Sequence, residues 1–296
     1  MAPDRICLNH NQGVDDMFVN FALKVENNEY VLHESPTASS VNDTITYEQP
    51  LLERMRLFMR IEELMHRFRF SLEGKSGWET HCALTTLIEI LDLTNRVDLK
   101  RELMKELERQ IANLSRLVSE PSVDQDRLNR IIDQQRALIE EIHTINGQLD
   151  QHIKANDLFG SIRQRNAIPG GTCDFDLPAY HYWLARPASE RRELLHTCSR
   201  PFQEINEAVG LVLKLIRNSA EPRTTVAPRG FYEQALDSSV PWQMIRITLP
   251  SDTPCYPEIS AGRQRFSVRF LKPGDMTQRA RQCEQDITFE LACCAL

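Results

Sequence analysis

Arginine is the residue type whose spacing in this sequence suggests chemistry. In the run RQRFSVRF, Arg263, Arg265 and Arg269 stand at even spacings, and in an extended strand they share one face. Arg246 takes an outward position in the alternating run WQMIRITL. A guanidinium group binds a carboxylate or a phosphate through paired hydrogen bonds. The spacing therefore predicts a basic strand face that captures an acidic peptide, with an ordinary solvated sheet face as the alternative.

The charge of the chain is distributed unevenly. The whole sequence carries a net charge of -7, but residues 223–283 hold nine basic and five acidic side chains. The overall acidity, and the lack of aromatic residues on the arginine-bearing face, disfavour a nucleic acid as the partner. A nucleic-acid binder acting through the arginine-rich strands stays an alternative, because phosphates fit the same guanidinium geometry.

Nothing in the sequence predicts export or membrane insertion. No apolar stretch approaches the roughly 20 residues of a membrane span, and the start MAPDRICLNH lacks the pattern of a secretory signal. The eight cysteines are scattered, as expected of reduced thiols rather than of a disulfide framework. We therefore expect a cytoplasmic protein without membrane contact.

The other chemically active residues do not form a recognisable catalytic motif. Cys173, Asp174, Asp176 and His181 are close in sequence, but no nucleophile-elbow pattern surrounds them. Residues 74–76 read GKS, yet the upstream glycine of a phosphate-binding loop is missing. The histidines show no spacing that suits a metal site. We predict no enzyme activity, no cofactor and no metal.

Two domains and a terminal extension are expected from the composition. Residues 1–43 are polar and lack an apolar period, which predicts a disordered extension. A helical domain is expected over residues 44–220, and a strand-rich domain over residues 221–296. The expected fold class is therefore α+β and mainly helical.

The helical period is strong from residue 51 onward. Apolar residues recur at steps of three and four, which predicts one buried helix face formed by Leu51, Met55, Phe58, Ile61, Met65 and Phe68. Arg56 and Arg60 fall on the opposite, basic side of this helix, although Glu63 shares that side. A second helix is expected through the run HCALTTLIEIL, ending near Asn95.

A long antiparallel helical hairpin is expected over about residues 98–158. Its first arm ends before Pro121, and its second arm carries a heptad-like seam of Ile131, Gln135, Leu138, Ile142, Ile145 and Leu149. Such a hairpin either packs within its own domain or meets another subunit. An adaptor that joins other proteins through residues 98–150 is therefore a further alternative function.

The apolar period changes to two in the last third of the chain. Three strands are predicted, each with one apolar face. The apolar residues are Ile245 and Ile247 in the first strand, Phe266 and Val268 in the second, and Phe289 in the third. We expect these strands to form one small antiparallel sheet, covered by helices on one side.

Several longer runs of this sequence resemble the ZapD family of bacterial cell-division proteins, which associate with the FtsZ ring. The resemblance rests on EQPLLERMRLFMRIEELM, SEPSVDQDRLNRIIDQ, IRQRNAIPGGTCDFDLPAYHYWL, VLKLIRNSA, RGFYEQ, YPEISAGRQRFSVRF and FELACC, in this order. It covers about residues 44–296, and the pattern IPGG-x-C-x-FDLP with FELACC is specific.

The resemblance implies a homodimer without catalysis or cofactor. It implies that the protein binds the C-terminal tail of FtsZ, crosslinks FtsZ filaments into bundles and stabilises the division ring at midcell during septation. The family's tail-binding residues fall on Arg60, His181 and Arg265, and Arg56, Arg246 and Arg269 match the same motifs more weakly. At Asp157 the family is expected to carry a basic residue, which puts that one contact in doubt.

Overall fold

The computed structural model describes residues 43–96, 98–121, 123–145, 156–275 and 277–296. The chain divides into two compact units, each built from separate stretches of sequence. Of the described residues, those within Met1–Arg56, Ala112–Ile131 and Leu213–Leu296 form a strand-bearing unit, and those within Leu57–Ile111 and Ile132–Val212 form a helical unit. The predicted α+β class is confirmed. The disorder predicted for residues 1–43 falls, apart from Asp43, outside the described residues.

The helical unit is organised by two successive helices, most of α2 (Glu53–Glu73) and the whole of α3 (Gly77–Arg96). The predicted apolar stripe of α2 is buried from Met55 to Phe68, as expected for a face with period 3.6. Helix α3 begins with a capping box, in which Glu79 accepts a hydrogen bond from the Ser76 backbone at 2.9 Å and donates its own backbone N–H to Ser76 Oγ at 3.2 Å. The GKS run therefore serves as a helix start.

Helices α7 (Asp157–Asn166) and α9 (Ala188–Ser199) pack against α3, and α8 (Pro178–Leu184) packs against α7. Tyr180 of α8 also shares a hydrogen bond of 2.8 Å with His81 of α3. Most of α10 (Gln203–Arg217) belongs to the same unit. Arg191, which is 6% exposed, ties the α2–α3 turn to the α8–α9 turn. Its guanidinium donates to the Lys75 carbonyl at 2.7 Å, to the Leu184 carbonyl at 2.9 Å and to Thr80 Oγ1 at 3.1 Å.

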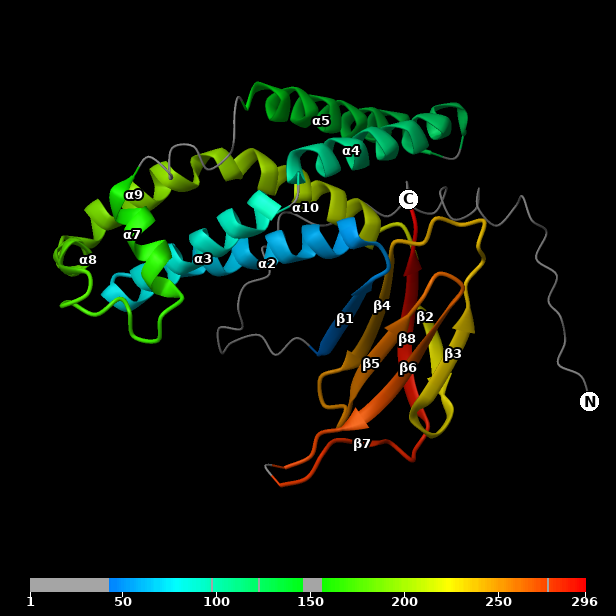
Figure 1. Ribbon diagram of the computed structural model, residues 1–296. Coiled ribbons are helices and arrows are strands. Elements are labelled where there is room, and N and C mark those ends of the chain that lie inside the picture. Colours follow the sequence, from blue (N-terminus) through cyan, green and yellow to red (C-terminus); the bar gives the residue numbers. More distant parts are fainter. Residues whose placement is uncertain (1–42, 97, 122, 146–155, 276) are drawn as a thin grey trace, which may run out of the picture. The chain divides into compact units, whose positions relative to one another are not determined.

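Helices α4 (Leu99–Ser115) and α5 (Gln125–Thr144) lie side by side and antiparallel, with the short 3-10 helix η2 (Arg116–Ser119) between them (Figure 1). Gln135, the polar residue of the predicted seam, is fully buried and donates to Gln110 Oε1 at 2.8 Å. Lys100 Nζ donates to the Ile145 carbonyl at 3.0 Å. Residues 146–155 lie outside the described residues, so the full length expected for the hairpin stays a prediction.

The strand-bearing unit contains two antiparallel sheets instead of the single sheet expected. The first has the order β1-β4-β8-β2, formed by β1 (Thr44–Pro50), β4 (Met244–Pro250), β8 (Ile287–Cys294) and β2 (Arg223–Ala227). The second has the order β3-β6-β5, formed by β3 (Phe231–Ala235), β6 (Arg265–Lys272) and β5 (Tyr256–Ala261). The short strand β7 (Arg281–Gln282) also pairs with β6, and the 3-10 helix η4 (Pro228–Gly230) leads into β3.

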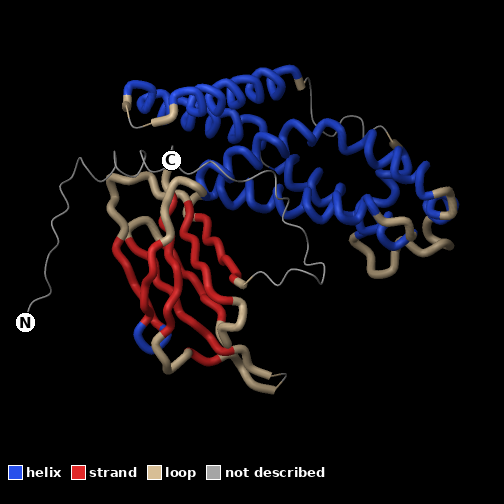
Figure 2. The backbone as a smooth tube through the Cα atoms, turned by 180° about the vertical axis from the view of Figure 1, so that it is seen from behind, coloured by secondary structure: helices blue, strands red, loops and turns tan. Residues whose placement is uncertain are grey.

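All three predicted strands exist, but only two of them pair with each other. Strands β4 and β8 are neighbours in the first sheet, whereas β6 is central in the second. Figure 2 shows the strands of the two sheets in red. Their apolar faces meet in one core, where the rings of Phe270 and Phe289 lie 5.1 Å apart. The expectation that helices cover the apolar face of a single sheet is therefore wrong, because each sheet covers the other.

The start of the fold also differs from expectation. Residues 44–50, which the sequence analysis assigned to the helical domain, form the edge strand β1, paired with β4 from Thr44 opposite Pro250 to Pro50 opposite Met244. A seven-residue strand rich in Thr and Tyr has a weak pattern on its own, and its partner is about two hundred residues away in sequence.

Candidate partner-binding site

The outer face of the β3-β6-β5 sheet carries the predicted arginine face. Along β6 the side chains alternate, with Phe266, Val268 and Phe270 buried and with Arg265 and Arg269 exposed. The period of two therefore predicted this strand correctly. Arg263 lies before the strand, in the turn that joins β5 to β6, so its place on the strand was wrong.

The neighbouring strands surround these arginines with residues that the sequence analysis did not select. Phe231 of β3 and Glu258 of β5 stand directly opposite Arg269 on its two sides. Glu233 of β3 stands opposite Ser267, between the two arginines. The alternation in FYEQA and in YPEISA was the available signal, but only the register of the sheet brings these residues to β6.

Each exposed arginine has one carboxylate partner. Arg265 Nη1 donates to Glu233 Oε1 at 3.1 Å, with the two side chains 77% and 44% exposed. Arg269 Nε lies 3.8 Å from Glu258 Oε2, an ion pair too long for a hydrogen bond. Exposed pairs of this kind contribute about 0 to 1 kcal/mol and open readily. Both guanidinium groups therefore remain reachable from solvent.

An open pocket of about 700 Å³ lies at the end of the sheet that carries Arg265. Its lining combines the β5–β6 turn with β3, and includes Phe231, Glu233, Arg263 and Arg265. The lining therefore offers guanidinium groups beside the aromatic ring of Phe231, a residue that is 42% exposed. This aromatic neighbour corrects the expectation that the arginine face lacks aromatic residues.

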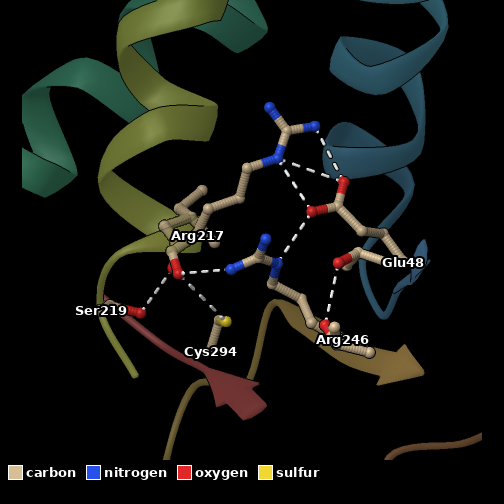
Figure 3. Close-up of polar contacts among 8 residues, drawn as sticks. Glu48, Arg217, Ser219, Arg246 and Cys294 are labelled. Carbon is tan, nitrogen blue, oxygen red and sulfur yellow. Dashed lines mark hydrogen bonds and ion pairs between the residues drawn. The ribbon is translucent and has the colours of Figure 1, made fainter. Parts of the chain in front are cut away.

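Arg246 does not belong to this face. Its side chain is 25% exposed, and its Nε donates to Glu48 Oε1 of β1 at 2.9 Å (Figure 3). Its Nη1 donates to the carbonyl of Arg217, the last residue of α10, at 3.1 Å. The prediction that Arg246 lies on an exposed strand face is wrong, because the end of α10 and the carboxylate of β1 enclose that side of β4.

Glu48 holds two arginines at once. Arg217 Nη2 donates to Glu48 Oε2 at 2.8 Å, and the Glu48 side chain is 15% exposed. Burial by itself would raise the pKa of Glu48, but the hydrogen bonds and positive charges of Arg217 and Arg246 outweigh burial and lower it. This ionic cluster, defined here as Glu48, Arg217 and Arg246, joins a helix end to two strands. We assign it to the stability of the fold.

The thiol beside the ionic cluster is not reactive. Burial raises the pKa of Cys294 to about 12, and its sulfur lies 4.0 Å from the Arg217 carbonyl (Figure 3). Cys173, the thiol considered as a nucleophile, is exposed, and the neighbouring Asp176 pairs with Arg165 at 3.1 Å. Among the described residues, no group of three or more His, Cys, Asp or Glu side chains is arranged to hold a metal ion.

The other expected contact residues lie in or near the helical unit. Arg60 is exposed on α2, and His181 is exposed on α8. Neither side chain has a hydrogen-bond or ion-pair partner within the described part of the chain. Arg56, one turn before Arg60, is half-buried and pairs with Glu53 at 3.3 Å. Arg60 and His181 are therefore open to a ligand from solvent.

Asp157 has a local structural role. It is the first residue of α7, where Asn156 caps the helix by accepting from the backbone N–H of Leu158 at 3.0 Å and of Phe159 at 3.4 Å. An acidic residue in the first helical turn is favoured by the helix dipole. Asp157 therefore suits a helix start.

Comparison with known proteins gives one consistent result. The family model described as "ZapD: Cell division protein" matches residues 59–269. The cell division protein ZapD of Methylococcus capsulatus is 39% identical over 256 residues, which cover 86% of this chain and the whole relative. This chain belongs to the ZapD family. The ZapD proteins of Dechloromonas aromatica and Nitrosomonas europaea are 36% and 38% identical over 252 residues, covering 85% of this chain and 100% and 95% of those relatives.

The ZapD match includes most of the residues that the sequence analysis expected to contact a partner. Arg60, His181, Arg246, Arg265 and Arg269 lie inside the matched residues, and Arg56 lies just before them. Membership of the ZapD family supports the expected role in cell division and septation. None of the described helices is both long and apolar enough to cross a membrane.

Proposed function

We propose that this protein binds the C-terminal tail of FtsZ and, as a homodimer, crosslinks FtsZ filaments and so stabilises the division ring at midcell. The observation that carries the proposal is the arginine face of β6. Arg265 and Arg269 project to solvent and Arg265 lines an open pocket, in a chain that belongs to a cell-division family. A guanidinium pair on a strand suits an extended acidic segment.

Arg265 is the principal tail contact in this proposal, and Arg269 supports it. Arg265 is the more exposed of the two, at 77% against 56%, and it lines the pocket. Arg60 and His181 add a further contact from the helical unit, with Arg56 as a weaker contributor. Arg246 is given no tail contact, because its guanidinium is engaged by Glu48 and by the Arg217 carbonyl.

Crosslinking requires two tails to be held at once. A homodimer presents two copies of each contact, and bivalence raises the effective concentration of the second tail without tight binding at either site. The attraction between exposed charges weakens with salt. Modest single-site affinity and strong bundling are therefore compatible.

The test is binding of a synthetic FtsZ C-terminal tail peptide, measured by fluorescence anisotropy. We expect Arg265→Gln to weaken binding by about five- to tenfold, because a charge-assisted hydrogen bond is lost. Arg279→Gln is the matched control, because it removes the same charge elsewhere on the surface. Arg279 is exposed and lies outside strands β3, β6 and β5 and outside the pocket lining. No peptide binding by the unaltered protein would refute the tail-capture proposal.

The dimer and the bundling have separate measurements. Light scattering should give about twice the chain mass of 34.2 kDa. Co-sedimentation with FtsZ polymers should decline as salt rises, and Arg265→Glu with Arg269→Glu should abolish it while circular dichroism stays unchanged. Undiminished pelleting at high salt would contradict an interface led by arginine.

A further inference from the structure

Two carboxylates of the protein already occupy the positions at which a ligand's carboxylates would bind the arginine face. Glu233 reaches Arg265 from β3, and Glu258 faces Arg269 from β5. The two acids come from opposite sides of β6, so each arginine has its own partner. In its unliganded state the face is thus partly neutralised.

We propose that Glu233 is an internal competitor of the acidic ligand, and that it sets the affinity and the charge selectivity of the site. The inference rests on the proposed function, since it concerns the same arginine face. For a ligand carboxylate to bind Arg265, the 3.1 Å contact with Glu233 must open, or both acids must share one guanidinium. Either route reduces affinity, because like charges are brought together or an existing ion pair is lost.

The geometry makes Glu233 the stronger competitor of the two acids. Glu233 accepts a hydrogen bond from Arg265, the more exposed arginine, and it lines the pocket. Glu258 stands 3.8 Å from Arg269 and is not in the lining. In the sheet register Glu233 is opposite Ser267, so its carboxylate reaches diagonally to Arg265, two residues before Ser267 on β6. Such a contact is held by the side chain alone and can open without moving the backbone.

Selectivity follows from the same competition. A neutral or weakly acidic peptide gains too little from Arg265 to displace Glu233, while a strongly acidic peptide compensates for the lost pair. Removing the Glu233 charge should therefore favour all carboxylate ligands and relax the preference for highly acidic ones. An internal acid at this place raises specificity at the expense of affinity.

The experiment compares three proteins for binding the FtsZ tail peptide: the unaltered chain, Glu233→Gln and Glu290→Gln. Glu290 is exposed on β8 of the other sheet, so its variant removes the same charge away from the arginine face. We expect Glu233→Gln to bind about two- to fivefold more tightly, as the release of one exposed ion pair allows, and Glu290→Gln to bind as the unaltered chain does. The gain should shrink as salt rises.

The outcomes separate the two proposals. If the unaltered chain binds the peptide and Glu233→Gln binds no more tightly than Glu290→Gln, the competitor role is refuted and tail capture stands. If only Glu233→Gln binds, the competitor role is supported, since the internal acid then blocks the site, and tail capture by the unaltered chain is refuted. If no variant binds, both proposals fall. A peptide whose acids are replaced by their amides should gain less from Glu233→Gln than the acidic peptide does if direct competition for Arg265 operates; an equal gain would refute it.

Discussion

Two groups of arginines in the strand-bearing unit have the same sequence pattern and different surroundings. On β6, Arg265 is 77% exposed and pairs with one exposed acid. On β4, Arg246 is 25% exposed and shares a single carboxylate with Arg217. The difference teaches that an ion pair becomes structural when its groups are removed from water, because an unpaired charge there has no solvent to replace its partner. An exposed pair can open at little cost and leave its arginine to a ligand.

The largest expected effect is on the enclosed cluster. Glu48→Gln leaves Arg217 and Arg246 close together without their shared carboxylate, and we expect the free energy of unfolding to fall by about 2–3 kcal/mol. Urea denaturation followed by circular dichroism measures this loss. Glu233→Gln is the control and should change stability by less than about 0.5 kcal/mol. Equal losses in the two variants would remove the distinction between the groups.

The same comparison predicts a dependence on pH. The pKa of Glu48 is lowered in the folded protein, below the ordinary value of 4.5, so its contribution to stability is complete above that value and is lost as the pH falls through the folded pKa. The stability difference between the unaltered protein and Glu48→Gln should therefore be constant near neutrality and shrink below about pH 4.5. A difference that stays constant down to pH 3 would argue against this carboxylate as the source.

The exposed arginines of β6 should matter for ligand binding and not for stability. Arg265→Gln should leave stability within about 0.5 kcal/mol, because its pair with Glu233 is solvated on both sides. The same variant should weaken tail-peptide binding, as proposed above. Denaturation and anisotropy on one preparation test both parts. A loss of stability comparable with that of Glu48→Gln would show that Arg265 supports the fold instead of a ligand.

The smallest effect is expected at Glu258. Because it lies 3.8 Å from Arg269, its pair is weaker than that of Glu233, and Glu258→Gln should tighten peptide binding by less than about twofold. Titration of the same peptide against Glu258→Gln and Glu233→Gln ranks the two acids. A larger gain from Glu258→Gln would place the main competition at Arg269 and not at Arg265.

Much of the fold and part of the site were accessible from the sequence. The helical period predicted the buried face of α2, and the alternation in RFSVRF predicted which residues of β6 are buried and which are exposed. These patterns are local, because a helix or strand sets the direction of each side chain within a few residues. The resemblance to ZapD proteins likewise depended on the sequence alone, and the family comparison confirmed it.

Only the tertiary structure decided what lies over each strand face. The alternation of side chains indicates that β4 and β6 each have two faces, but it does not indicate what covers each face. Glu48 reaches Arg246 from a strand about two hundred residues earlier, and Glu233 and Phe231 reach β6 through sheet register. Exposure and partnership are set by such long-range pairing, and so the sequence identified the arginines while the fold separated the structural arginine from those open to a ligand.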